Sequence, residues 1–128
     1  MKRRILAIVP AVLFIVCASH TLPLQFRAST GSAIYYSGGN GESKDSAILI
    51  RGALRQSEGI EAEHYFLGRM FGEKGKAWDV QDQTIIREEK RIYDMVEIQL
   101  MPSLQKRIFY FDVSKLPWVL QSPKPERE

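Results

Sequence analysis

Two aspartates in the C-terminal half are the side chains best suited to acid–base chemistry. Asp94 and Asp112 lie on segments that we expect to be neighbouring strands. Two carboxyl groups that converge in a cleft can act as general acid and general base, which predicts a small carboxylate-dependent hydrolase with His64 as a further candidate. The alternative, which we favour, is that each aspartate sits at a strand end and stabilises a turn.

The position of Asp94 in its strand makes this residue the stronger candidate of the two. Strict alternation places it on the face that carries Ile92 and Val96, so we expect its carboxyl group to be buried or close to the rim of the core. Burial without a partner raises the pKa of a carboxyl group or destabilises the fold. We therefore expect a partner such as Arg91, Arg107 or a backbone amide.

A second motif, Glu61-x-x-His64, places a carboxylate and an imidazole on one face of a helix, where they can bind a metal ion. Di-iron bundle proteins use this motif twice, together with two further glutamates from other helices. This chain has one copy of the motif and one long predicted helix. We therefore expect no metal and no cofactor, and we interpret His64 as a solvated or edge-packed side chain.

Glycines gather in the segment Ser37-Gly38-Gly39-Asn40-Gly41, which precedes a predicted strand. A P-loop needs the pattern G-x-x-x-x-G-K-[ST] between a strand and a helix, so that backbone amides converge on phosphate. Here Lys44 follows a serine and no helix comes next, so we expect a flexible lead-in loop rather than a phosphate cradle. The candidates for binding a ligand or partner in this region are Tyr36, Gly38, Gly39 and Asn40.

One aromatic residue is predicted to face away from the core. The segment 108–113 alternates, with Phe109 and Phe111 on one face and Tyr110 on the other. Most aromatic side chains should be buried, because a small domain without disulfides depends on its core. The outward position of Tyr110 therefore predicts an aromatic surface on the sheet face that points away from the core. Such a surface suits a protein partner or a small apolar ligand.

Hydrophobic periodicity predicts an α+β fold that would position these residues. A short apolar run at 47–50 predicts a buried strand, and three- and four-residue spacing predicts an amphipathic helix at 57–72. Period-two alternation predicts strands at 78–86, 92–100 and 108–113. The order strand-helix-strand-strand-strand indicates one helix packed on a curved antiparallel sheet, the outline of cystatin-like folds. That outline carries no activity with it.

The predicted helix has recognisable ends and one unusual interior residue. Ser57 is the expected N-cap, and Gly72 or Gly75 the expected end. Gly68 lies inside the helix, where glycine costs about 1 kcal/mol relative to alanine. We expect close packing against a strand or an early frayed end to explain it.

The N-terminal segment has the pattern of a secretory signal peptide. Three basic residues at 2–4 precede an uncharged apolar run at 5–18, which is shorter than the roughly 20 residues of a transmembrane helix. Val16 and Ala18 are small enough to precede a cleavage site, so we expect an exported protein, periplasmic or extracellular. The alternatives are an uncleaved N-terminal anchor and lipidation at Cys17.

Cleavage after Ala18 changes the charge balance of the chain. It removes 18 of the 128 residues and three of the 18 basic side chains, which leaves 110 residues with 15 basic and 15 acidic side chains. A neutral chain argues against a nucleic-acid-binding protein and a polybasic membrane module. Cys17 is the only cysteine, so the mature domain would lack disulfides and a thiolate nucleophile.

Four segments are expected along the chain. They are a signal peptide at 1–18, an extended leader with the glycine loop at 19–46, the α+β domain at 47–116 and a C-terminal tail at 117–128. The leader should contain a short strand at 33–36. A domain of this size forms one core, so two domains are excluded.

Several segments together resemble a family of small bacterial exported proteins. They are Tyr36-Ser37-Gly38-Gly39-Asn40-Gly41, Ala47-Ile48-Leu49-Ile50 with Gly52-Ala53, Glu58-Gly59-Ile60 with Ala62-Glu63, Tyr93-Asp94 with Glu97, and Tyr110-Phe111-Asp112-Val113. The resemblance covers 35–114. The family has no established activity, so the resemblance implies no functional residues.

The missing nucleophile, the missing metal cluster and the neutral charge favour a non-catalytic binding or interaction module. Such a module would bind a protein, an envelope component or a small ligand through the sheet face or the glycine loop. The alternative is the hydrolase described above, with Asp94 and Asp112. We expect no nucleic-acid partner, and membrane contact only through an uncleaved signal segment.

Overall fold

Residues 24–121 are described in the computed structural model of the chain, so the predicted signal peptide with Cys17 and the end of the predicted tail lie outside the described residues. The elements are β1 (Gln25–Arg27), β2 (Ala33–Gly38), β3 (Ile48–Arg51), α1 (Gln56–Phe71), β4 (Trp78–Arg87), β5 (Ile92–Leu100), β6 (Lys106–Asp112) and α2 (Pro117–Gln121). Within this part of the chain no helix is long and apolar enough to cross a membrane. The predicted α+β fold class is confirmed.

The six strands form one sheet in the order β1-β2-β3-β6-β5-β4. Strands β4, β5 and β6 form the antiparallel meander that their short connections predict. Strands β3 and β6 pair in parallel, with Ile48 opposite Phe111, so the sheet is mixed rather than wholly antiparallel. The parallel pair arises because α1, β4 and β5 intervene between these two strands, and a crossover of that length can bring the chain back in the same direction.

Strands β1 and β2 come from the segment that we expected to be an extended leader. The predicted strand at 33–36 is present, and β2 pairs antiparallel with β3 through Tyr36 and Ile50. Strand β1 adds to the outer edge of β2. The core sheet therefore extends N-terminal to residue 47, because the alternating buried residues Ile34 and Tyr36 make β2 part of it.

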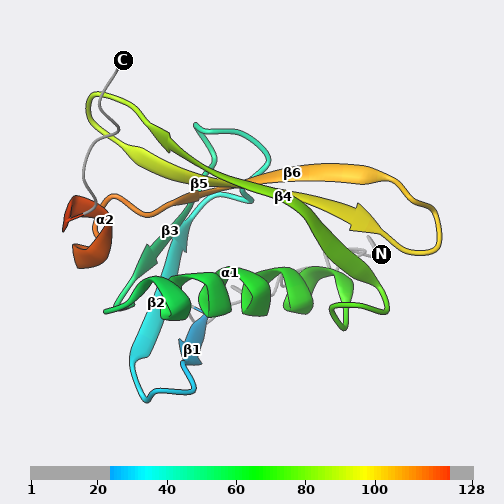
Figure 1. Cartoon of the computed structure of the whole chain (residues 1–128), viewed down its shortest axis with the longest axis horizontal. Coiled ribbons are helices and arrows are strands. Elements are labelled where there is room, and N and C mark those ends of the chain that lie inside the picture. The colour runs from blue at the N-terminus through cyan, green and yellow to red at the C-terminus, as the bar shows by residue number, and fades with distance from the viewer. Residues whose placement is uncertain (1–23, 122–128) are drawn as a thin grey trace, which may run out of the picture.

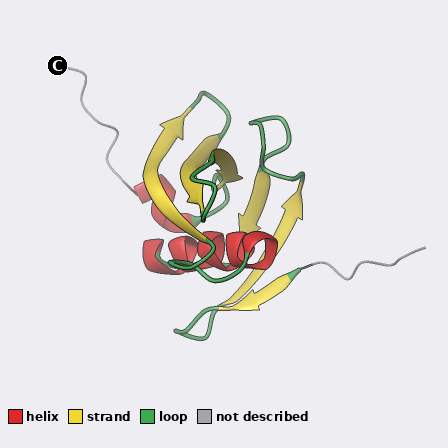
Figure 2. Ribbon diagram, turned by 90° about the vertical axis from the view of Figure 1, so that its right-hand side faces the viewer, coloured by secondary structure: helices red, strands yellow, loops and turns green. Residues whose placement is uncertain are grey.

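Helix α1 crosses one face of the curved sheet, as Figures 1 and 2 show from two directions. We call the face beneath α1 the inner face and the opposite one the outer face. The core lies between α1 and the inner face and includes Ile34, Ile48, Ile50, Leu67, Trp78, Val96, Ile98, Phe109 and Phe111. The shared core face predicted for alternate residues of 109–113 is confirmed.

The ends of α1 differ from each other in how they are capped. The helix begins after Arg55, whose backbone is extended and whose side chain forms no cap hydrogen bond. Ser57, the expected N-cap, lies within the first turn. Gly72 ends the helix as predicted, with a φ of 108° and its N–H donating to the carbonyl of Gly68 at 3.0 Å.

Two interior glycines of α1 have opposite surroundings. A Cβ added to Gly59 would lie 2.8 Å from Cζ2 of Trp118, so glycine at this position allows α2 to pack closely on α1. A Cβ added to Gly68 would meet nothing within 4 Å. Gly68 is neither packed against a strand nor at a frayed end, and nothing in the structure requires glycine there.

A β-bulge changes which side chains of β4 face inward. The register between β4 and β5 shifts between Val80 and Asp82. Before the shift Trp78 faces the core, and after it Gln83 lies opposite Val96 on the inner face. The unbroken alternation that we expected through this strand is therefore wrong, because a bulge inserts one unpaired residue.

Candidate functional site

Two buried carboxyl groups meet beneath α1. Glu63 of α1 is 1% exposed and Asp94 of β5 is 2% exposed. The side-chain amide of Gln83, turned inward by the bulge, donates to Glu63 Oε2 at 2.8 Å and to Asp94 Oδ2 at 2.6 Å. One amide nitrogen therefore joins two carboxyl groups from different elements.

The surroundings of this pair favour its protonated form. Burial raises the pKa of Glu63 well above its usual value, and the adjacent Asp94 carboxyl raises it further. Burial also raises the pKa of Asp94. The pair consequently holds a proton at pH values at which an exposed carboxyl group is already ionised.

The sequence correctly placed Asp94 on the core face of its strand, but its partner differs from the expected one. We expected Arg91, Arg107 or a backbone amide to stabilise the carboxyl group. Its partners are instead Glu63 and the side chain of Gln83.

Asp112 lies on the other side of the sheet. In the β5–β6 register Asp94 is opposite Phe111 and Asp112 is opposite Tyr93, so the two aspartates point to opposite faces. Asp112 Oδ1 accepts from the Ser114 N–H at 3.0 Å and from the Ser114 hydroxyl at 2.6 Å. Asp112 therefore stabilises the turn after β6, and it does not converge with Asp94.

The two members of the Glu61-x-x-His64 motif face different neighbours. Glu61 accepts from the backbone N–H of Ser29 at 2.8 Å and from its hydroxyl at 3.0 Å. The His64 ring packs edge-on against Trp78, with 5.9 Å between ring centroids, and burial lowers the pKa of His64. Across residues 24–121 no group of three or more potential ligands is arranged to hold a metal ion.

The glycines of the 37–41 segment serve a close backbone contact. A Cβ added to Gly38, whose φ is 93°, would lie 2.4 Å from the Ala47 carbonyl oxygen. A Cβ added to Gly39 would lie 2.5 Å from the Ser46 carbonyl oxygen. Glycine is therefore needed for the two arms of this loop to approach each other.

Hydrogen bonds hold the same loop in place. We expected a flexible loop before the strand, and the structure shows a packed one. Asn40 Oδ1 accepts from the N–H of Glu42 at 3.1 Å, which closes a local turn. The Gly41 carbonyl accepts from the N–H of Tyr110 in β6 at 2.7 Å. The loop thus adds a hydrogen bond along β6, next to the residues of β6 that pair with β3.

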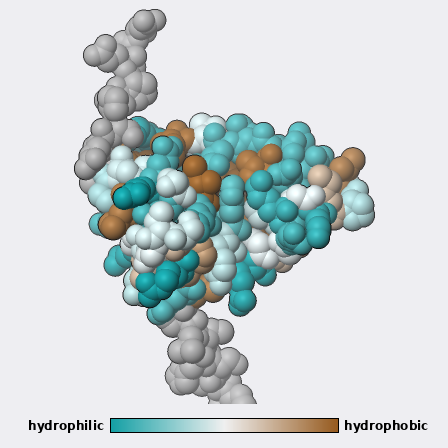
Figure 3. Space-filling model, turned by 60° about the horizontal axis from the view of Figure 1, so that its bottom comes forward, coloured by the Kyte–Doolittle hydropathy of each residue, from teal (hydrophilic) through white to brown (hydrophobic). Residues whose placement is uncertain are grey.

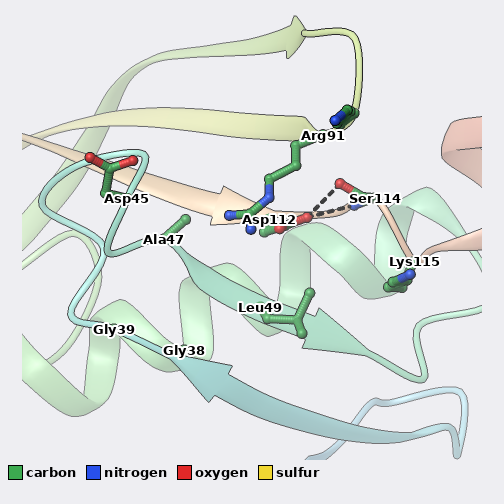
Figure 4. A pocket seen from close by; sticks show the side chains of 10 residues that line it. Gly38, Gly39, Asp45, Ala47, Leu49, Arg91, Asp112, Ser114 and Lys115 are labelled. Atoms are coloured by element: carbon green, nitrogen blue, oxygen red, sulfur yellow. Dashed lines mark hydrogen bonds between the residues drawn. The ribbon is translucent and has the colours of Figure 1, made fainter.

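A cleft of about 490 Å³ lies on the outer face, where the glycine loop meets the ends of β5 and β6 (Figure 4). We call it the outer cleft. Its lining residues are Gly38, Gly39, Asp45, Ala47, Leu49, Lys90, Arg91, Asp112, Ser114 and Lys115. Figure 4 shows the Arg91 side chain extending over the sheet toward the end of β6.

The charges of the outer cleft are unequal. Lys90, Arg91 and Lys115 border it, against Asp45 and Asp112. The salt bridges among residues 24–121 involve none of the three cations. The cleft is therefore net positive.

Tyr36 and Tyr110, both candidates from the sequence, have different positions. Tyr36 is a core residue whose hydroxyl donates to the Ala62 carbonyl at 2.6 Å, so it does not take part in a surface site. Tyr110 is half-buried on the outer face, edge-on to Tyr93 at 6.5 Å between centroids. Lys44 lies over the Tyr93 ring, which further limits the exposed aromatic area.

Apolar side chains do not form a broad surface on the side that carries α1. Figure 3 shows them there in small groups separated by hydrophilic residues. Scattered exposed apolar residues are normal on a folded domain and do not indicate an interface. The outer cleft and the charges around it therefore give the more specific information.

The alternation of β5 predicts the inward position of Asp94, but the positions of Glu63 and Gln83 beside it were not predicted. Glu63 lies three residues after Ile60 and four before Leu67, which is the spacing of the buried stripe of α1, so the pattern contained a signal for it. Gln83 carried no signal, because its inward direction depends on the bulge in β4.

Comparison with known proteins adds no further information on the site. No family model matches the chain, and searches of curated proteins and of solved structures return no match. The resemblance to small bacterial exported proteins therefore stays a prediction.

Proposed function

We propose that this chain is a non-catalytic binding module of an exported protein, periplasmic or extracellular, and that its outer cleft binds an anionic group. That group would belong to an envelope component, a secreted protein or a small ligand. The unpaired positive charge of the outer cleft carries the proposal. Export rests on the N-terminal sequence pattern, with an uncleaved anchor or lipidation at Cys17 as the alternatives.

The chemistry of the lining supports an anionic ligand. Arg91 offers a planar guanidinium group that can donate two parallel hydrogen bonds to a carboxylate or phosphate. Lys90 and Lys115 add point charges from the flanking segments, and a concave surface strengthens their combined field. Asp112 already accepts two hydrogen bonds from Ser114, so its carboxylate is partly engaged.

The same geometry weighs against the hydrolase alternative. Asp112 borders the outer cleft, whereas Asp94 borders a separate cavity on the inner face. A general acid and a general base must both reach one substrate, which these two residues cannot do through the sheet.

The experiment compares two charge-reversed variants of a tagged domain in pull-downs from a bacterial envelope extract. The cleft variant is Arg91→Glu/Lys115→Glu. The matched control is Arg55→Glu/Arg69→Glu, which reverses two exposed arginines away from the outer cleft. We expect the native domain and the control to recover one stoichiometric partner and the cleft variant to lose it.

Salt provides a second readout. Binding that depends on exposed charges weakens as ionic strength rises, because screening shortens the reach of each charge. A partner that the cleft variant recovers as well as the native domain does would overturn the proposed site. Recovery of no partner by the native domain would count against the binding function itself.

A further inference from the structure

A second cavity lies on the inner side of the sheet, away from the outer cleft. It has a volume of about 120 Å³ and is lined by Gln56, Ile60, Gln83, Ile85, Asp94 and Trp118. These residues belong to α1, β4, β5 and α2, and Figure 1 shows α2 beside the first turns of α1. Gln56 and Ile85 are exposed, so the cavity opens to solvent between α1 and β4.

The carboxyl pair at the base of this cavity is incompletely satisfied. Asp94 lines the cavity, and its Oδ1 is buried without a hydrogen-bond partner among residues 24–121. Glu63 Oε1, on the other side of the shared Gln83 amide, is buried and unpartnered in the same way. Within the described residues neither carboxyl group forms a salt bridge. The proton that the pair holds supplies one donor between the two carboxyl groups. A bound group with several N–H donors can satisfy the acceptor sites that remain.

We infer that this cavity binds the primary ammonium group of a small organic cation, with Asp94 as the residue that accepts its hydrogen bonds. An ammonium group brings three N–H donors and a positive charge to a site that has spare acceptors and no cation. The inference is independent of the outer cleft, because the two cavities have no lining residue in common.

The other walls of the cavity specify an alkyl ammonium rather than a bare ion. Ile60 and Ile85 offer apolar contacts to a short carbon chain, and Trp118 places an aromatic ring at the wall. A metal ion would need three or more ligands, and residues 24–121 contain no group of three or more His, Cys, Asp or Glu side chains that could hold one. The volume is several times what one ordered water needs.

The test is a titration of the full-length chain with n-butylammonium, followed through the 15N–1H NMR spectrum. We expect saturable shifts of the Gln83 side-chain amide, the Asp94 backbone amide and the Trp118 indole. The uncharged analogue n-butanol, which has the same carbon chain, should cause no saturable shift. A second arm uses a short unstructured peptide with an acetylated N-terminus and one lysine, because a lysine side chain of a protein partner carries the same ammonium group.

The two arms identify the source of the ligand. Binding of n-butylammonium alone points to a free amine, and binding of the peptide as well points to a lysine side chain. Both results support the inference. If neither probe binds, the inference is overturned. It is also overturned if n-butanol binds as tightly as n-butylammonium, because the site would then recognise only the carbon chain.

Variants test the role of Asp94. The isosteric change Asp94→Asn should weaken n-butylammonium binding about tenfold or more, since it removes a charge-assisted hydrogen bond. Glu61→Gln serves as the control, because Glu61 bonds Ser29 outside the cavity and its loss should leave the affinity unchanged. Should Asp94→Asn fail to fold, Gln56→Lys places a competing charge at the exposed mouth and should also weaken binding. Unchanged affinity in the folded variants would overturn the inference.

Discussion

The same substitution at two glycines of α1 should change stability in opposite directions. Gly68→Ala adds a methyl group where no atom lies within 4 Å. Gly59→Ala adds one 2.8 Å from Cζ2 of Trp118, a distance at which two carbon atoms overlap. Both residues are inside one helix, so the intrinsic gain in helix propensity is shared and the surroundings decide the difference.

The expected magnitudes follow from these surroundings. Alanine in place of an interior helical glycine gains about 0.5–1 kcal/mol. Gly68→Ala should keep this gain, which corresponds to a rise in Tm of about 4–8 °C per kcal/mol for a domain of this size. In Gly59→Ala the overlap with Trp118 costs about 1–3 kcal/mol, which exceeds the gain. That variant should therefore be less stable than the native protein.

Urea denaturation monitored by circular dichroism measures both effects on the free energy of unfolding. The m-value should stay constant, because neither methyl group changes the surface exposed on unfolding appreciably. In a Trp118→Leu background, which removes the overlapping ring, Gly59→Ala should become neutral or stabilising. The reasoning is refuted if Gly68→Ala destabilises the domain, or if Gly59→Ala stabilises it while Trp118 is present.

Three further predictions concern the core and the loops. The raised pKa of Glu63 means that the native state binds more protons than the unfolded state above about pH 4. The free energy of unfolding should therefore decrease with rising pH, by up to about 1.4 kcal/mol per pH unit for one proton. Glu63→Gln should flatten this profile in urea titrations at several pH values, and an unchanged slope would contradict the assignment. Tyr36→Phe removes the hydrogen bond to the Ala62 carbonyl and should cost about 1 kcal/mol, measured as a lower urea midpoint. Gly38→Ala should cost at least about 2 kcal/mol in the same assay, because positive φ and a backbone overlap act together, whereas Gly31→Ala meets only the strain of positive φ and should cost less.

The fold could be predicted from the sequence wherever one periodicity extended over a whole element. The alternation in β5 and β6 identified both strands and their buried faces, including the burial of Asp94. Strand β1 was missed because it has three residues, too few to show a period. The parallel pairing of β3 and β6 was missed for a different reason, since pairing partners are set by the global topology rather than by any local pattern.

The candidate sites were harder to predict because they depend on tertiary placement. The glycine loop was identified from composition, but its packing against β6 and its place at the outer cleft depend on the sheet order. The helix motif Glu61-x-x-His64 had the right spacing for a shared face, yet Glu61 accepts a hydrogen bond from Ser29 whereas His64 packs against Trp78.

The register of β5 against β6 decides which acids can act together, and the core sets that register. Val96 pairs with Phe109, and both are fully buried against α1. A slip by one residue would turn Phe109 and Phe111 toward solvent, at a cost of several kcal/mol in lost burial. No arrangement of Asp94 and Asp112 can compensate for such a loss, so apolar packing keeps one aspartate in the inner cavity and the other at the outer cleft. Each carboxyl group can therefore interact only with residues on its own face of the sheet. For this reason Glu63 and Gln83, rather than Asp112, determine what Asp94 can bind.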